Sequence, residues 1–262
     1  KTALDYLIKV KELPFTEAVE RIVGRAAERP SVFHARAQPE KPKTLLLPPE
    51  SNSNTRVIAY LKSRGIDGGL IEQCIRSGQL YESLPYHNAV FVGMDRDGTP
   101  RYACLRGIGT DFKGEATGSD KRFSFALPAT GESRMLCVFE SAIDLLSYAT
   151  MAQAGGLSWR SQHLLSLAGV YKPQKETQEH RLPLALTQYL KDHAEIKTIC
   201  LCLDNDMTGR SATEAIRQQL AERYKVASAF PRQGKDYNDW LCIRMGLQPA
   251  KENPMTERSF AR

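Results

Sequence analysis

The chain has 262 residues, of which 42% are hydrophobic, and this excludes disorder along its whole length because one large core or two smaller ones can form. Lysine and arginine number 36 against 30 acidic residues, a net charge of +6 that favours a polyanionic partner without requiring one. No apolar run approaches the roughly 18 to 20 residues that span a bilayer, so we expect no integral membrane protein and no membrane partner.

The cysteine pattern predicts reduced thiols and no zinc site within this chain. Six cysteines stand at positions 74, 104, 137, 200, 202 and 242. They form no CxxC pair and have no neighbouring histidine at a zinc-ligand spacing. A chain of this length does not need disulfides to hold its core together, so we expect a reducing, cytoplasmic compartment.

The first 54 residues predict two short amphipathic helices followed by a linker. Apolar residues recur at helical spacing on both sides of Leu13-Pro14-Phe15, which places the helices within residues 1–28. Residues 29–54 contain five of the 14 prolines and many polar side chains, which predicts a Pro-rich linker. The chain opens at Lys1 rather than at methionine, without a charged-then-apolar leader, so it is either a processed protein or a segment of a longer one, and we favour the second.

Residues 55–133 predict a smaller α+β subdomain. Two helices, each ending before a glycine, are expected at 57–64 and 69–77. Two strands that flank the turn Asp95-Arg96-Asp97-Gly98 then predict a hairpin, at 89–92 and 101–106.

Residues 134–242 predict an α/β domain with a mostly parallel sheet flanked by helices, because strand and helix patterns alternate along the chain. The strands are expected at 135–139, 163–168, 197–203 and 225–230, and the helices at 141–154, 183–193 and 209–223. Residues 243–262 are mostly polar and predict a C-terminal tail.

Acidic residues follow three of the predicted parallel strands. Glu140 follows the first, Asp204 and Asp206 follow the third, and Asp236 and Asp239 follow the fourth. Ligands of such sheets gather at the carboxyl ends of the strands. Two carboxylates about 4 Å apart repel by about 4 kcal/mol at an effective dielectric constant of about 20, so a cation is expected between them, and oxygen ligands favour Mg²⁺ or Mn²⁺. Alternatively, the aspartates after the third strand cap the following helix.

Three motifs in this order resemble the Toprim domain shared by bacterial primases, topoisomerases and some nucleases. They are Phe139-Glu140-Ser141-Ala142-Ile143-Asp144, Leu203-Asp204-Asn205-Asp206 with Gly209, and Gly234-Lys235-Asp236-Tyr237-Asn238-Asp239. The resemblance implies that Glu140 acts as an acid/base or metal-site residue and that Asp204 and Asp206 bind Mg²⁺. For Asp236 we expect a place in the same metal site, against the alternative of an ordinary turn residue.

The resemblance extends beyond these motifs. Residues 59–66, 88–91, 95–98 and 105–107 are similar to the part of bacterial primases that precedes Toprim. Residues 2–23 resemble the helical tail of the Cys/His zinc-binding module that opens such primases. Residues 118–122 and 235–239 look more like the primase-like Toprim proteins of plasmids and integrative elements.

Several charged residues are candidates for supporting roles. Asp144 lies four residues after Glu140, where it could orient that side chain or be an exposed helical acid, and Asp239 is a second supporting candidate. Phosphate groups of a nucleotide or of nucleic acid would be contacted by basic side chains, with solvated surface charge as the alternative. These candidates are Arg101, Arg106, Lys121, Arg122 and Lys235.

These observations favour a primase-like nucleotidyltransferase that makes short primers on single-stranded DNA from nucleoside triphosphates, with Mg²⁺, in a plasmid or other mobile element. A helicase or a relaxase is a possible partner. A Toprim phosphodiester nuclease would use the same acids to activate water, and a non-catalytic DNA-binding module of a replication or transfer complex would keep them for structure. A topoisomerase is disfavoured, because its nucleophilic tyrosine requires further strand-passage domains.

Overall fold

The computed structural model describes residues 7, 11, 44–169 and 182–249. The chain divides into two units, Lys1–Pro42 and Lys43–Arg262, and both described β-sheets belong to the second. The helices expected within residues 1–28, residues 29–43 of the expected linker and residues 250–262 of the expected tail lie outside the described part, apart from Leu7 and Lys11. No helix in the described ranges is long and apolar enough to cross a membrane.

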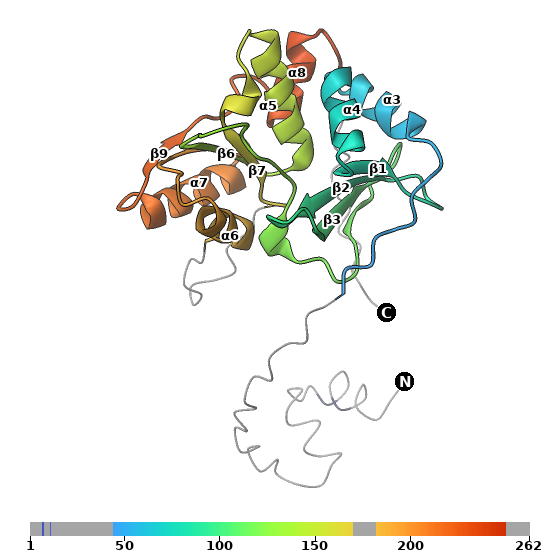
Figure 1. Cartoon of the computed structure of the whole chain (residues 1–262), viewed down its shortest axis with the longest axis horizontal. Coiled ribbons are helices and arrows are strands. Elements are labelled where there is room, and N and C mark those ends of the chain that lie inside the picture. The colour runs from blue at the N-terminus through green and yellow to red at the C-terminus, as the bar shows by residue number, and fades with distance from the viewer. Residues whose placement is uncertain (1–6, 8–10, 12–43, 170–181, 250–262) are drawn as a thin grey trace. The chain divides into compact units, whose positions relative to one another are not determined.

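The first half of the second unit is an α+β layer, as expected (Figure 1). Helix α3 ends before Gly65, whose φ of +80° is the left-handed conformation that commonly closes a helix. The elements of this half are the helices α3 (Thr55–Ser63) and α4 (Gly68–Arg76) and an antiparallel sheet of β1 (Leu80–Glu82), β2 (Ala89–Met94), β3 (Pro100–Arg106) and β4 (Lys113–Glu115).

The described end of the expected linker is hydrogen-bonded to this half. The Ser51 amide donates to the Glu82 carbonyl at 2.8 Å, and the Tyr81 hydroxyl donates to the Pro48 carbonyl at 2.9 Å. The Leu46 amide donates to the Thr117 carbonyl at 2.9 Å. These hydrogen bonds attach residues 46–51 of the expected linker to the antiparallel half.

The second half confirms the α/β prediction. Its five strands lie in the order β5-β7-β6-β8-β9, and β5 alone runs antiparallel to its neighbour. The strands are β5 (Ala126–Leu127), β6 (Met135–Phe139), β7 (His163–Ser166), β8 (Thr198–Cys202) and β9 (Lys225–Ser228). The helices are α5 (Ala142–Ala154), α6 (Leu184–Asp192), α7 (Met207–Leu220) and α8 (Tyr237–Arg244), with short 3-10 turns η1 (Lys121–Phe123) and η2 (Trp159–Ser161).

Two elements depart from the predicted domain boundaries. Strand β5 lies within the range expected for the first subdomain but pairs with β7 of the second sheet. Its two residues are too few to show a strand pattern. Helix α8 extends to Arg244, past the expected end of the α/β domain at residue 242.

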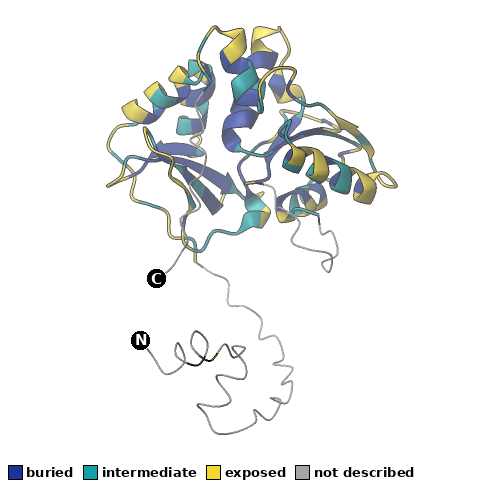
Figure 2. Ribbon diagram, turned by 180° about the vertical axis from the view of Figure 1, so that it is seen from behind, coloured by how far each residue is buried: buried dark blue, intermediate teal, exposed yellow. Residues whose placement is uncertain are grey.

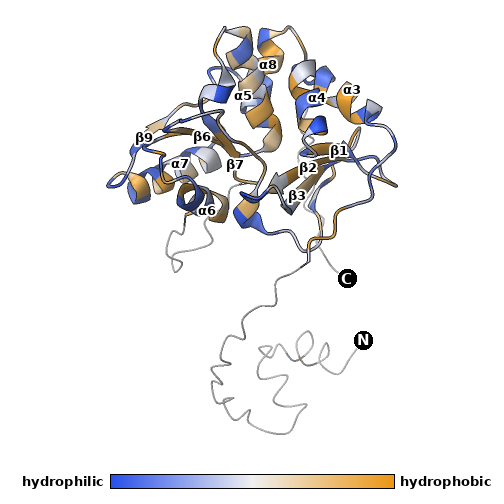
Figure 3. Ribbon diagram, viewed as in Figure 1, coloured by the Kyte–Doolittle hydropathy of each residue, from blue (hydrophilic) through white to orange (hydrophobic). Residues whose placement is uncertain are grey.

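The parallel sheet lies between two layers of helices. Along β6, Leu136 and Val138 pack with α6 and α7, whereas Cys137 and Phe139 pack with α5 and α8. This alternation is the period of two expected of a strand buried on both faces. Buried residues accordingly run through both sheets (Figure 2), and the strands are mostly apolar (Figure 3).

One apolar core joins the two halves. It combines residues of α3, α4 and the antiparallel sheet with α5 and one face of the parallel sheet. Phe91 of β2 and Phe125 beside β5 meet edge to face, with ring centroids 5.7 Å apart. Helix α5 has buried side chains along most of its length, and they belong to the core that contains residues of both halves.

A buried polar junction also joins the halves. Asn238 of α8 is only 2% exposed. Its Nδ2 donates to the Arg64 carbonyl and to Ser147 Oγ, both at 2.9 Å, and its Oδ1 accepts from Arg64 Nε at 2.8 Å. Arg64 follows α3 and Ser147 belongs to α5, so one side chain connects three helices.

Asn238→Ala should lower the free energy of unfolding by about 2–4 kcal/mol, because it removes these bonds and leaves buried partners unpaired. Urea denaturation followed by circular dichroism measures this change. Asn52→Ala is the matched control, because Asn52 is exposed and its replacement should change the free energy by less than about 0.5 kcal/mol. Equal stability of the two variants would show that the junction is unimportant.

Candidate active site

The carboxyl edge of the parallel sheet brings Glu140 and Asp204 together. Strands β6 and β8 are parallel neighbours, and Phe139 at the end of one is paired with Cys202 at the end of the other. The chain then continues to Glu140 and, one residue beyond Leu203, to Asp204. The Asp204 amide donates to Glu140 Oε1 at 3.4 Å. The predicted convergence of these two acids is therefore present in the structure.

Asp206 lies at the start of α7. Its Oδ1 accepts from the Gly209 amide at 2.8 Å, so the alternative interpretation of this acid as a helix cap is correct. A Cβ at Gly209 would lie 2.2 Å from the Asp204 carbonyl oxygen, so only glycine permits so close a turn. Asp206 remains 38% exposed, which leaves an oxygen available to a ligand.

Lys235 provides the positive charge between these two aspartates. Its Nζ lies 3.8 Å from Asp204 Oδ2 and 3.6 Å from Asp206 Oδ2. Its carbonyl accepts from the Asn205 amide at 2.7 Å, which fixes the loop before α8 against the loop before α7. Lys235 is thus the basic candidate that lies directly at the acidic edge.

Asp236 caps the start of α8, and Asp239 binds the backbone just before that cap. Asp236 Oδ1 accepts from the Asp239 amide at 2.7 Å, and Asp239 Oδ2 accepts from the Lys235 amide at 3.0 Å. Asp239 therefore fixes the loop. Burial, followed by the charge of Asp144, raises the pKa of Asp236 to about 7.

Asp144 is buried rather than exposed. It accepts from Ser141 Oγ at 2.5 Å and from the Asn238 amide at 3.2 Å, and so connects the first turns of α5 and α8. Burial raises its pKa, and the positive charges of Arg64 and Arg106 oppose that rise. No hydrogen bond joins Asp144 to Glu140 among the described contacts, so its influence on Glu140 is electrostatic.

The carboxylates at this edge repel one another. Burial raises the pKa of Glu140 to about 7, with further contributions from Asp206 and Asp144. Burial likewise raises the pKa of Asp204 to about 8, followed by the charges of Asp144 and Glu140. Lys235 opposes both shifts without cancelling them. At neutral pH these carboxyls are therefore partly protonated, and a bound cation would favour their ionised forms.

The other basic candidates divide into two sets. Arg106, at the end of β3, acts electrostatically on Asp144 and is thus near the acids. The remaining three pair with local acids: Arg101 with Asp95 at 3.8 Å, Lys121 with Glu115 at 2.8 Å, and Arg122 with Asp120 at 2.5 Å. Each of these three is thus paired with an acid of the antiparallel half.

The donor set of the acidic edge fits a hard divalent cation. Glu140, Asp204 and Asp206 offer carboxylate oxygens, which Mg²⁺ and Mn²⁺ prefer. In this structure, the carboxylate oxygens of these three acids do not all lie within 4.8 Å of one another. Mg²⁺ commonly binds through one or two carboxylates and keeps water at its other positions, so the open arrangement suits it.

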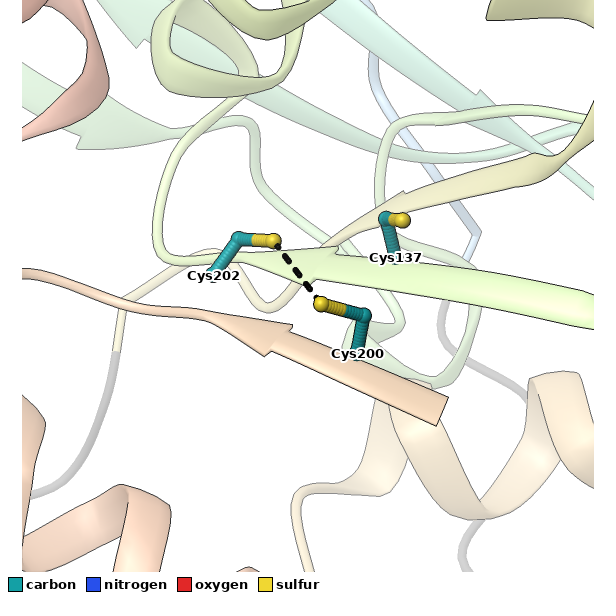
Figure 4. Close-up of side chains that lie close together, drawn as sticks. All are labelled: Cys137, Cys200 and Cys202. Carbon is teal, nitrogen blue, oxygen red and sulfur yellow. Dashed lines mark hydrogen bonds between the residues drawn. The ribbon is translucent and has the colours of Figure 1, made fainter. Parts of the chain in front are cut away.

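Three cysteines lie close together beneath the same edge (Figure 4). Cys137 of β6 and Cys200 and Cys202 of β8 have their sulfur atoms within 4.8 Å of one another, and Cys202 Sγ lies 3.7 Å from Cys200 Sγ. Their period of two places them on the face that packs with α5 and α8.

The comparisons with known proteins agree with the Toprim resemblance of the second half. Residues 137–241 match the family model described as Toprim-like, and residues 59–131 match that of a protein family of unknown function, DUF3991. The segment 137–241 is therefore similar to Toprim-like domains, and it contains Glu140, Asp204 and Asp206. The resemblance inferred from the three motifs is confirmed over this range.

Two curated relatives are longer proteins. The 65 kDa protein of Zymomonas mobilis is 26% identical over 212 residues, which cover 76% of this chain and 33% of that protein. An uncharacterized protein of Bacillus anthracis, pXO2-78, is 27% identical over 168 residues, which cover 60% of this chain and 44% of that protein. The chain thus matches less than half the length of each.

Solved structures with a similar arrangement include two primase fragments. The DnaG catalytic core shows 15% identity and a TM-score of 0.49, with 74% of this chain and 70% of that chain covered. The primase fragment of the bacteriophage T7 primase-helicase protein shows 17% identity and a TM-score of 0.47, with 71% and 69% covered.

The hydrogen bonds between Arg64 and Asn238, which support the site, could not be predicted from the sequence. Asn238 was part of a recognised motif but had no assigned partner, and Arg64 lies 174 positions away in the chain. The available signal was the position of Arg64 directly before Gly65, where a helix ends. Only the folded chain shows that this end contacts α8.

The metal-free protein should lose stability as the pH rises from about 5 to about 8.5. A carboxyl whose pKa is raised by folding favours the folded state while protonated, so its contribution is complete below its ordinary pKa and is lost as the pH passes the folded value. For Glu140 and Asp204 that value is about 7 and about 8. Thermal unfolding in a chelator, measured at several pH values, gives the slope.

Asp204→Asn should flatten this slope, because the amide does not titrate. Added Mn²⁺ should raise the unfolding temperature of the wild type more at pH 8.5 than at pH 5.5, and the variant should respond less. The exposed Glu222 supplies the control Glu222→Gln, which should keep the wild-type slope. A variant slope identical to the wild type would contradict the assigned charge repulsion.

Proposed function

We propose that this chain carries the nucleotidyl-transfer site of a primase-like protein, which makes short primers on single-stranded DNA from nucleoside triphosphates. The supporting observation is the acidic edge within the Toprim-like segment, where Glu140 contacts the Asp204 amide and Lys235 lies within 4 Å of both Asp204 and Asp206. A plasmid or integrative element is the proposed setting, in keeping with the pXO2 designation of the Bacillus anthracis relative. We place the activity in the cytoplasm, where such templates occur.

The acids have distinct proposed roles. Asp204 and Asp206 would hold Mg²⁺, with Asp236 close to the same charge cluster. When bound there, the ion supplies charge neutralisation for the triphosphate and for the leaving group. Glu140, whose pKa of about 7 lies near neutral pH, suits a general base that accepts the proton of the attacking 3′ hydroxyl. It is also a candidate ligand for a second ion.

Lys235 would contact phosphate. Its Nζ is near both aspartates, and its side chain is 40% exposed, so a triphosphate oxygen can approach it from solvent. As a compact point charge on a flexible stem, it can follow the phosphate during transfer. Its loop is fixed by Gly234, with a φ of +74°, and by Asp239.

The basic residues outside the edge suit a nucleic-acid path. Arg101 and Arg122 both lie over the Phe123 ring, with guanidinium carbons 5.4 Å and 5.6 Å from its centroid. Lys121 precedes Arg122 in η1. Arg106 lies at the end of the strand β3 that contains Arg101, and its charge acts on the buried Asp144. Phosphate contacts of this kind give affinity that depends on salt but not on base sequence. A helicase or relaxase is the proposed partner that would deliver the strand.

The direct test incubates the chain with single-stranded DNA, Mg²⁺ or Mn²⁺ and labelled nucleoside triphosphates, beside a reaction with end-labelled template. New short labelled products on a denaturing gel are expected. Glu140→Gln and Asp204→Asn should each lower product formation by about 10²-fold or more, since each removes a group that acts on the reacting atoms.

Glu222→Gln is the control variant. Glu222 lies past the far end of α7, and the 14 residues of this helix, at a rise of about 1.5 Å each, separate it from the capping Asp206 by about 20 Å. It should retain wild-type synthesis. Shortened template without new product would instead assign the nuclease. Neither product, together with retained DNA binding that is unchanged in Asp204→Asn, would assign a non-catalytic DNA-binding module.

A further inference from the structure

A second group of possible metal ligands lies at the opposite edge of the parallel sheet. His163 is the first residue of β7, His193 follows the last turn of α6, and Glu195 lies in the loop before β8. The acidic edge is at the other end of these strands, a full strand length away. This group therefore belongs neither to the proposed catalytic site nor to its charge network.

The three side chains converge on one carboxylate oxygen. His193 Nδ1 lies 2.9 Å from Glu195 Oε1, and His163 Nε2 lies 3.7 Å from the same atom. The two imidazole rings are 4.6 Å apart. Ligand atoms about 2.0–2.1 Å from a tetrahedral ion are roughly 3.3 Å from each other, so these separations need only small adjustments to enclose one ion.

His163 supplies an independent indication of a ligand. The residue is 3% exposed, and its Nε2 has no hydrogen-bond partner among the described residues. Buried polar atoms are nearly always paired, because an unpaired one loses its hydration without compensation. The unpaired nitrogen faces Glu195, the direction from which a cation would complete it.

We propose that His163, His193 and Glu195 bind a Zn²⁺ ion. Two imidazole nitrogens and one carboxylate oxygen are a donor set that suits zinc and leaves a fourth position for water. Glu195 is 47% exposed and His193 20% exposed, so an ion can reach the group from solvent. The expectation of no zinc site rested on spacing along the chain, whereas these ligands are assembled by β7, α6 and the loop before β8.

Tyr189 positions both imidazoles. Its hydroxyl lies 3.0 Å from His163 Nδ1, and its ring stacks on His193 with centroids 4.3 Å apart. The Ala129 amide donates to the same Nδ1 at 3.4 Å, a longer contact that is lost when Nδ1 carries the proton. A metal-binding imidazole usually donates through its other nitrogen to an oxygen, and the tyrosine hydroxyl is available for that contact. The bound ion would fasten the end of α6 to the start of β7.

The test titrates Zn²⁺ into the purified, chelator-treated chain by calorimetry, with excess Mg²⁺ present to occupy the carboxylate edge. One ion per chain is expected. His193→Ala and Glu195→Gln should each weaken binding at least tenfold, and both side chains are exposed enough to replace without disrupting the core. His87→Ala is the matched control, because His87 pairs with Glu82 in the other half and its loss should leave zinc affinity unchanged.

Two further readouts separate this site from the cysteine cluster. Zn²⁺ should raise the unfolding temperature of the wild type and of Cys200→Ser, but not of His193→Ala. Co²⁺ bound in place of zinc should lack the sulfur-to-metal charge-transfer absorption of a thiolate site. Absence of zinc binding by the wild type, or binding lost in Cys200→Ser and retained in His193→Ala, would overturn the proposal.

Discussion

The burial of several carboxyl groups together at one edge of the parallel sheet is the constraint around which this site is organised. Glu140, Asp204 and Asp236 all have raised pKa values because burial removes water that would stabilise their charge. Backbone amides hold two of the aspartates at this edge, because Asp206 caps α7 and Asp236 caps α8. Lys235 opposes part of this rise for Glu140 and Asp204, and a divalent cation would favour the ionised carboxylates further.

The antiparallel half contributes to the same balance. Arg64 and Arg106 both belong to that half, and their positive charges act on the buried Asp144 of the Toprim-like domain. Asn238 fixes the end of α3 to α5 and α8, so this electrostatic support depends on the contact between the halves. The shared apolar core then makes the contact permanent. The two matched family segments, 59–131 and 137–241, are thus physically coupled at the candidate site.

The sequence predicted the features that depend on local periodicity. The positions of β6 and α5, the hairpin of β2 and β3, and the convergence of Glu140 with Asp204 all follow from strand and helix patterns and from the rule that ligands gather at carboxyl ends. Features that depend on distant partners were not predictable in this way. Strand β5 is defined by pairing with β7, and the His163 group by three elements that meet only in the fold.

The most direct measurement of the central claim is the anomalous scattering of Mn²⁺ soaked into crystals of this chain at about pH 8, because carboxyls with raised pKa values are more protonated at lower pH. The account predicts an anomalous peak against Asp204 and Asp206, on the side that Glu140 faces, and its loss in crystals of Asp204→Asn. A peak that persists unchanged in that variant, or Mn²⁺ bound elsewhere with the acidic edge empty, would contradict the account.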